Sequence, residues 1–117
     1  MKKSEEKIVT INSLKKIEFL PVGNVLYLEA AGECTYIVAP GNKKHTSTKN
    51  LGSCCVALKA YNINRLGKSY ALNINRIESF DGKTRKIFFS HDIAITIPKE
   101  QVAKFKAMLK TNALVYR

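Results

Sequence analysis

The run RLGKSYALNINRI, residues 65–77, combines cations, amides and a serine and contains no acidic residue. A lysine side chain can donate to the O6 and N7 atoms of guanine, and a serine hydroxyl can donate to a phosphate oxygen. Gly67 permits a bend or a positive φ, which would place Lys68 and Ser69 at the tip of a turn or a bulge. The pattern is typical of a nucleic-acid contact, and an exposed turn with solvated cations is the alternative.

The charge of the whole chain favours a polyanionic partner. The 117 residues carry a formal net charge of +11, and residues 1–40 contribute none of it, because five Lys are matched there by five Glu. The polar run 43–49, Lys68 and Lys99 could form one basic surface, and a helix beginning near Pro98 would add unpaired N–H groups that suit phosphate. A one-sided field fits nucleic acid or an anionic membrane, although a merely basic domain would show it too.

Two segments have the periodicity of short helices. From Leu51 to Leu58, apolar residues recur at i, i+3, i+4 and i+7, with Cys54 and Cys55 between the ends. Asn50 is the expected N-cap, and Thr48 is the competing cap. The second helix opens at Pro98. Its apolar face is expected to consist of Val102, Phe105 and Leu109, with Met108 beside it.

The remaining apolar segments alternate with a period of two, which indicates short strands. Asp81-Gly82 is a strong hairpin signal, and the polar run 43–49 fits only an exposed or edge strand. Asn73 is expected to hold a turn by local hydrogen bonding. We therefore predict one mainly β domain with about eight or nine short strands and two short helices. The expected strands cover residues 8–11, 15–20, 25–30, 34–38, 43–49, an alternating stretch from Leu66 to Ile77, 76–80, 84–89 and 93–97.

The sequence contains no pattern typical of an enzyme or a metal site. HExxH, GxSxG and phosphate-binding glycine loops are absent. The three cysteines form no CxxC pair, and His45 and His91 are not at ligand spacing. A turn with a solvated Asp92 is favoured over a His91–Asp92 dyad. We expect no enzyme, no cofactor and no metal, with the cysteines buried in a reducing compartment. The start lacks a signal peptide and no run could span a membrane, so we expect a cytoplasmic protein.

Four stretches of the chain match motifs of a known family. VLYLEAAGECTYIV fits a strand pattern that reads roughly I-x-Y-I-E-A-x-x-x-Y-x-x-I, and NLGSCCVALKAY fits the helix that follows. INRLGKSYALNINRI fits the most specific motif, roughly F-x-R-x-H-R-S-Y-x-V-N-x-x-x-I, and TIPKEQVAKF fits the closing strand and helix start. The chain thus resembles the LytTR (LytR/AlgR-type) DNA-binding domain of bacterial response regulators over residues 15–110. The aligned positions of the specific motif are Arg65, Ser69, Tyr70, Asn73 and Ile77.

The resemblance implies a fold and a mode of binding. The fold is an elongated stack of small antiparallel β-sheets with short helices, and its loops enter successive major grooves of double-stranded DNA and bend the duplex. Base contacts are implied for Thr35, with Glu33 nearby, for Lys68 at the tip, and for Lys99 at the last helix start. The phosphate candidates are Lys44, Lys49, Arg65 and Ser69, of which Ser69 is best supported by the match.

Two positions depart from the family pattern. Gly67-Lys68 stands where the family has His-Arg, and Pro98-Lys99 stands where it has Ser-Arg. Lysine keeps the charge of arginine but lacks its bidentate fork, so the base preference is expected to differ. The resemblance divides the chain into an N-terminal extension with a possible first strand (1–14), the DNA-binding domain (15–110) and a C-terminal tail (111–117).

The leading hypothesis is a sequence-specific regulator of transcription that binds double-stranded DNA. Two copies are expected on repeated half-sites, and any receiver domain or sensor kinase of a two-component system would lie outside this chain. A β-domain that binds RNA or single strands is the alternative, and it would need stacked aromatic residues along a basic groove. A basic module for an acidic protein or a membrane is a third, although no amphipathic basic helix supports the membrane version. The aromatic residues are Tyr36, Tyr61, Tyr70, Phe88 and Phe89, most of them at expected core positions.

Overall fold

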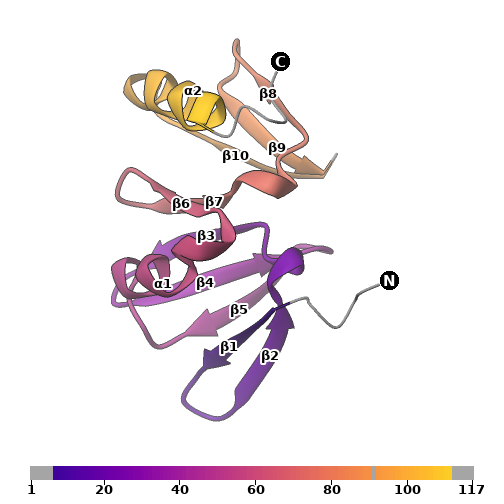
Figure 1. Cartoon of the computed structure of the whole chain (residues 1–117), viewed down its shortest axis with the longest axis vertical. Coiled ribbons are helices and arrows are strands. Elements are labelled where there is room, and N and C mark those ends of the chain that lie inside the picture. The colour runs from indigo at the N-terminus through magenta and orange to yellow at the C-terminus, as the bar shows by residue number, and fades with distance from the viewer. Residues whose placement is uncertain (1–6, 91, 112–117) are drawn as a thin grey trace. The chain divides into compact units, whose positions relative to one another are not determined.

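The computed structural model describes residues 7–90 and 92–111 and shows a mainly β chain with short helices (Figure 1). The strands form three small antiparallel sheets of two, five and three strands. This confirms the predicted class of fold. The chain divides into two compact units, Met1–Asn73 and Ile74–Arg117. His91 and residues 112–117 of the expected tail lie outside the described residues.

The first unit is built on a five-stranded sheet in the order β5-β4-β3-β7-β6. All neighbouring strands are antiparallel. β5 lies at an edge, as its polar sequence predicted, because an edge strand needs no apolar neighbour on its outer side. The strands are β3 (Tyr27–Ala31), β4 (Cys34–Ala39), β5 (Lys43–Ser47), β6 (Ile63–Leu66) and β7 (Tyr70–Asn73).

Helix α1 (Leu51–Leu58) covers one face of this sheet. Asn50 is its N-cap: the side-chain oxygen accepts from the backbone N–H of Ser53 at 2.8 Å. This confirms the predicted cap. Leu51, Cys54 and Leu58 are buried in a shared core with residues of β3, β4 and β7, while Cys55 is only half-buried. The helix ends in a 3-10 turn, η3 (Lys59–Tyr61).

Two further strands precede the sheet. β1 (Ile8–Asn12) and β2 (Ile17–Pro21) form a two-stranded antiparallel hairpin, and a short 3-10 turn, η2 (Val22–Asn24), connects it to β3. The backbone N–H of Thr48 donates to the carbonyl of Asn12 at 2.9 Å, which ties the hairpin to the chain after β5. The strand expected at residues 8–11 is therefore present.

The second unit consists of a three-stranded sheet and helix α2 (Val102–Thr111). The sheet order is β10-β9-β8, with β8 (Ser79–Asp81), β9 (Lys86–Ser90) and β10 (Ile93–Thr96). Phe105 of α2 is fully buried, and its ring lies 5.0 Å from the ring of Phe80 between centroids. The helix is preceded by a 3-10 turn, η5 (Lys99–Gln101), for which Pro98 takes the cap position.

The alternating stretch expected from Leu66 to Ile77 is not one strand in the structure: Leu66 ends β6, residues 67–69 form a turn, and the rest is divided between β7 and a 3-10 turn. β7 ends at Asn73, and Ile74–Arg76 form a 3-10 turn, η4. The buried side-chain amide of Asn73 donates to the carbonyl of Val25 at 2.7 Å, across 48 positions of sequence. The expected structural role of Asn73 is confirmed, and this bond is long-range, because its partner belongs to the segment before β3.

The Asp81-Gly82 hairpin is also present, but its connection is longer than a two-residue turn. β8 ends at Asp81 and β9 begins at Lys86, so four residues link them. The Asp81 carboxylate accepts from the backbone N–H groups of Lys83 (2.9 Å) and Thr84 (3.4 Å), which closes the wider turn. Arg85 completes it in a left-handed conformation with φ 61°.

Candidate nucleic-acid interface

The β6–β7 turn carries the cations that the sequence placed at a tip. Gly67 has φ 73°, a conformation that glycine adopts without steric cost, and Lys68 and Ser69 after it are exposed. The Arg65 guanidinium donates from Nε to the carbonyl of Gly67 at 3.0 Å and from Nη2 to that of Lys68 at 3.4 Å. Arg65 therefore shapes the turn, while no ion pair to a described residue holds the Lys68 ammonium.

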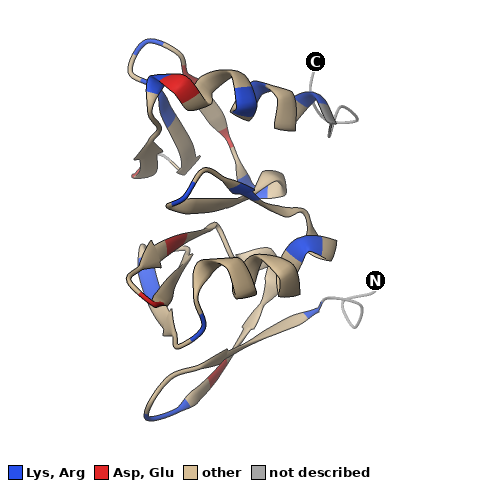
Figure 2. Ribbon diagram, turned by 90° about the vertical axis from the view of Figure 1, so that its left-hand side faces the viewer, with Lys and Arg blue, Asp and Glu red and all other residues tan. Residues whose placement is uncertain are grey.

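Several loops meet at the end of the five-stranded sheet where this turn lies. The backbone N–H of Ala30 donates to the carbonyl of Ser69 at 2.8 Å, which joins the β6–β7 turn to the end of β3. The β3–β4 turn, which contains Glu33, comes directly after the end of β3. Because the start of β4 pairs with the end of β5, the segment between β5 and α1, which contains Lys49, lies at the same end of the sheet. We call Glu33, Lys49, Lys68 and Ser69 the loop end of the sheet. Figure 2 shows the blue of lysine or arginine at the tip of the β6–β7 turn and just before α1.

Thr35 lies inside the protein at this end. Its side chain is fully buried, and its hydroxyl donates to the carbonyl of Lys49 at 2.8 Å. The backbone N–H of Lys49 in turn donates to the Ser47 hydroxyl at 3.1 Å, while the Lys49 side chain remains exposed. In this structure Thr35 has no surface to offer to a base, and it positions the backbone of a phosphate candidate instead.

Lys44 is placed away from the loop end. It pairs across the ladder with Val38, three residues before β5 ends at Ser47, which corresponds to roughly 10 Å of strand. Its ammonium lies 3.9 Å from a Glu29 carboxylate oxygen and 5.1 Å from the centroid of the Tyr36 ring. Lys44 is therefore engaged on the face of the sheet, and it adds little to the loop end.

Lys99 belongs to a basic group in the second unit. It is exposed at the start of η5, two residues after Ile97. Arg85 and Ile97 exchange two bonds: the Ile97 N–H donates to the Arg85 carbonyl at 3.0 Å, and Arg85 Nε donates to the Ile97 carbonyl at 3.1 Å. The β8–β9 turn with Lys83, and Lys86 at the start of β9, thus lie beside the start of η5. The sequence analysis missed this group, although the cations of DGKTRK were a signal for it.

The acidic residue of that turn has a structural role. The two backbone N–H groups that bond to Asp81 stabilise its charged form, so they lower the pKa of this carboxyl below its ordinary value. The carboxylate fixes the turn from which Lys83 projects. The β6–β7 turn is held in a similar way, by the hydrogen bonds from Arg65 to its carbonyls.

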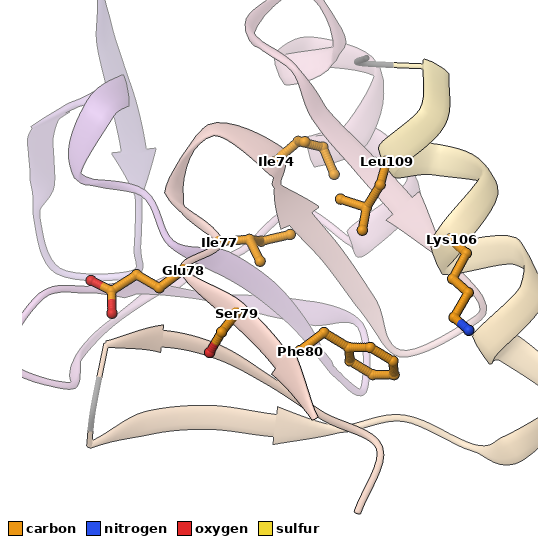
Figure 3. A pocket seen from close by; sticks show the side chains of 7 residues that line it. All are labelled: Ile74, Ile77, Glu78, Ser79, Phe80, Lys106 and Leu109. Carbon is orange, nitrogen blue, oxygen red and sulfur yellow. The ribbon is translucent and has the colours of Figure 1, made fainter. Parts of the chain in front are cut away.

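A hollow in the second unit has mostly apolar walls, with Ser79 and Lys106 also in its lining. Its volume is about 360 Å³, and Ile74, Ile77, Phe80 and Leu109 form its apolar walls. Figure 3 shows the Glu78 side chain pointing away from these walls. In the described part of the chain no cluster of three or more histidine, cysteine or acidic residues could hold a metal ion. No helix among the described residues has the length and hydropathy needed to cross a membrane.

On the described face of the five-stranded sheet that carries Tyr36 and Tyr70, the aromatic residues do not form a stacking platform for single strands. Phe89 is buried, and Tyr27 and Tyr70 pack edge to face with centroids 5.9 Å apart. Tyr36 and Tyr70 are both half-buried, and strand pairing places Glu29 directly between them. An acidic side chain between two aromatic rings opposes a nucleic-acid backbone there, so this face does not favour RNA or single-stranded DNA.

Comparison with known proteins agrees with the motifs. The profile of LytTR, described as the LytTr DNA-binding domain, matches residues 15–110. The chain therefore belongs to the LytTR family of DNA-binding domains, and the resemblance drawn from its motifs is confirmed. No curated protein matches the chain.

A solved structure shows the same fold. It is the LytTr DNA-binding domain of a protein described as a methyl-accepting/DNA response regulator from Bacillus cereus. The match has a TM-score of 0.69 and covers 89% of this chain and 97% of that chain, at 22% sequence identity. At this identity the likeness concerns the fold.

Proposed function

We propose that this chain reads specific sequences of double-stranded DNA as a regulator of transcription, with its loops in successive major grooves. The observation that supports this most is the loop end of the five-stranded sheet. There Lys49, before α1, and Lys68 and Ser69, in the β6–β7 turn, project from two separate loops in a member of a DNA-binding family. Protruding loops with cations fit a groove, whereas a flat basic face would contact phosphates alone.

The proposed roles follow from what each side chain can donate or accept. Lys68, at the tip of a fixed turn, would donate to guanine O6 or N7. Glu33 in the neighbouring turn would accept from cytosine N4. Lys49 and Ser69 would bind phosphates on either side of the groove and set the register. Thr35 is not part of this set, because it is buried.

Two predicted phosphate contacts take lesser roles. Arg65 donates from Nε and Nη2 to carbonyls of its own turn, so we assign its main role to shaping the loop, with its other guanidinium N–H groups directed at a phosphate. Lys44 would contribute to the general positive field. In the second unit, Lys99 and Lys83 would form a separate contact, with Lys99 as the base-reading candidate.

The arrangement on DNA is proposed to involve two copies. Half-sites about one helical turn apart place two proteins on the same side of the duplex. In this proposal the input comes from outside the chain, through a receiver domain or a sensor kinase of a bacterial two-component system. The site of action would be the cytoplasm, where the DNA lies.

Selection from a random duplex library at near-physiological salt tests the proposal. The enriched duplex, its two separated strands and an unrelated duplex are then compared by fluorescence anisotropy. We expect an enriched motif that binds at least about 10³-fold tighter than the unrelated duplex. Absence of enrichment, or tighter binding of the single strands, would overturn the proposal and favour the alternative of a single-strand or RNA binder.

A further inference from the structure

The tip of the β1–β2 hairpin combines an exposed apolar side chain with two cations. Leu14 is 94% exposed, more than any other large apolar residue of the described chain, and Lys15 and Lys16 directly after it are also exposed. Lys16 lies 3.4 Å from a carboxylate oxygen of Glu18, whereas no described residue forms an ion pair with Lys15. An apolar side chain beside cations suits a partner that is anionic and also offers apolar surface.

The turn that carries these residues is closed by its own hydrogen bonds. The N–H and the hydroxyl of Ser13 both donate to the Lys16 carbonyl at 3.0 Å, and the Lys16 N–H donates to the Ser13 hydroxyl at 3.3 Å. Leu14 and Lys15 are therefore the two residues at the end of a held turn. Such a turn loses little conformational freedom when it enters a groove.

The hairpin tip lies beside the loop end of the five-stranded sheet. The Thr48 N–H donates to the Asn12 carbonyl at 2.9 Å, so the last residue of β1 contacts the residue directly before Lys49. Residues of the tip and of β5 also line a shared hollow of about 480 Å³. Figure 2 shows the blue of the hairpin tip on the same side as the blue just before α1. The tip thus adds two lysines next to a proposed phosphate contact.

Strand order arranges the contacts of this end in a row. Lys49 follows the edge strand β5, Glu33 lies between β4 and β3, and Lys68 lies between β7 and β6. Neighbouring strands are about 4.8 Å apart, so roughly 17 Å separates Lys49 from Lys68, or about five base pairs of B-DNA. Figure 1 shows β1 and β2 beyond β5, on the side away from β7. The hairpin tip therefore continues the row past Lys49.

The groove at this position differs from the groove that Lys68 would read. Lys49 is proposed to bind the phosphate backbone on one side of a major groove, and the groove beyond that backbone is the minor groove. Proteins that bind the minor groove insert apolar side chains such as leucine and place lysine or arginine beside them. Leu14 and Lys15 at the end of a held turn have this chemistry.

We propose that the tip of the β1–β2 hairpin is a further DNA contact, in which Lys15 and Lys16 bind phosphates outside the sequence read by the loop end and Leu14 enters the minor groove between them. This inference rests on the proposed DNA binding. Lys15 is the principal cation, because Lys16 shares its charge with Glu18. One or two further strand spacings, roughly 10 Å, lie between Lys49 and the tip, so the site extends by about three base pairs on one side.

Duplexes with flanks of different length test the contact. The selected half-site is extended on one side or the other by up to about one helical turn, and binding is measured by fluorescence anisotropy at several salt concentrations. Extension on one side only should tighten binding at least about tenfold. On that duplex Lys15→Ala should reduce the salt slope by about 0.9. Lys7→Ala, which removes the same charge directly before β1, is the matched control and should leave the slope unchanged.

The minor-groove contact has a test that uses the wild type. A flank of inosine·cytosine pairs presents the same major groove as guanine·cytosine pairs but lacks the N2 amino group in the minor groove. The wild type should bind the inosine flank at least about threefold more tightly than the guanine flank. Leu14→Ser should lose this preference. Val56→Ser, which removes an exposed apolar side chain in the second half of α1, should keep it.

The outcomes separate this inference from the proposed function. If the selected half-site is not bound with any flank, the proposed function fails. If it is bound but neither flank length nor Lys15→Ala changes the binding, or if the inosine and guanine flanks bind alike, the hairpin contact is overturned. Flotation with vesicles of phosphatidylglycerol and phosphatidylcholine in equal parts, abolished by Lys15→Ala while DNA binding is unchanged, would assign the tip to a membrane and also overturn it.

Discussion

Lys68 stands on a turn whose shape is fixed by its own neighbours. We predict that Lys68→Ala weakens binding to the selected duplex by about 1–3 kcal/mol and relaxes the base preference at one position. Anisotropy on the selected duplex and on duplexes substituted at single positions measures both effects. Lys59→Ala, at the opposite end of α1, should change neither. An equal loss on every sequence would reduce Lys68 to a phosphate contact.

Thr35 is expected to affect stability more than recognition. Thr35→Val keeps the shape of the side chain but removes the hydroxyl that donates to the Lys49 carbonyl. We predict a loss of about 1 kcal/mol in the free energy of unfolding, measured by urea denaturation, with the base preference retained. Thr46→Val, on the exposed side of β5, should stay within about 0.5 kcal/mol of the wild type. Loss of base preference in the Thr35 variant would contradict the buried role.

At the residue scale, the sequence indicated which side chains have the chemistry to contact DNA. It did not indicate which of them are buried or already hydrogen-bonded within the protein. Lys68 and Ser69 were predictable because glycine and the flanking strands define a tip. Thr35 and Arg65 were not separable from the other candidates, because their partners are backbone carbonyls that no side-chain pattern reveals. The Asn73 bond to Val25 was hidden for the same reason.

At the scale of the elements, the sequence offered two candidates for the N-cap of α1, Asn50 and Thr48. The structure assigns it to Asn50, whose side chain accepts from the Ser53 N–H. We predict that Asn50→Ala lowers the free energy of unfolding by about 1 kcal/mol and that Thr48→Ala has a much smaller effect. Urea denaturation monitored by circular dichroism compares the two variants. A larger loss in the Thr48 variant would reverse the assignment.

The β1–β2 hairpin is linked to the main sheet by a titratable pair. His45 Nδ1 on β5 lies 3.1 Å from Glu18 Oε1 on β2, and Lys16 lies 3.4 Å from the other carboxylate oxygen. The hydrogen bond with His45 is the main cause that lowers the pKa of Glu18, and Lys16 adds to it. A lowered pKa in the folded state contributes stability above the ordinary pKa of glutamate, and this is lost as the pH falls through the lowered value.

The link between the hairpin and β5 can therefore be followed by titration. We predict that His45→Ala raises the pKa of Glu18 toward its ordinary value, because the principal partner of the carboxylate is removed. Side-chain carboxyl NMR measures the midpoint in both proteins. The shift should remain partial, since Lys16 is still present. An unchanged midpoint would show that the pair is not formed in solution.

The elements themselves were largely predictable from spacing. Apolar periods of two and of 3.6 located both helices and every strand except β6, and the polar composition of β5 placed it at an edge. The predicted element boundaries differ from the structure at places where a single polar side chain makes hydrogen bonds. At the end of β7 the Asn73 amide bonds to Val25 across the unit, and in the β8–β9 turn the Asp81 carboxylate accepts two N–H groups. Neither the partner nor the width of a turn is encoded in periodicity.

For the whole molecule, the charge distribution predicts a strong dependence on salt. Each phosphate that the protein neutralises should contribute about −0.9 to the slope of log K against log salt concentration. Titrations of the selected duplex at several salt concentrations measure this slope. Lys49→Ala, a proposed phosphate contact, should reduce it by about 1 on all sequences. A flat response of the wild type would contradict the electrostatic basis of the proposed interface.

The two bonds from Arg65 to its own turn have a thermodynamic consequence. A loop whose carbonyls are already held loses little conformational freedom when it enters a groove, whereas a loose loop must be ordered at that moment. Binding through the β6–β7 turn should therefore lack the large negative heat-capacity change of coupled folding. By bonding to its own turn, Arg65 would keep the turn rigid and so lower the entropic cost of binding DNA.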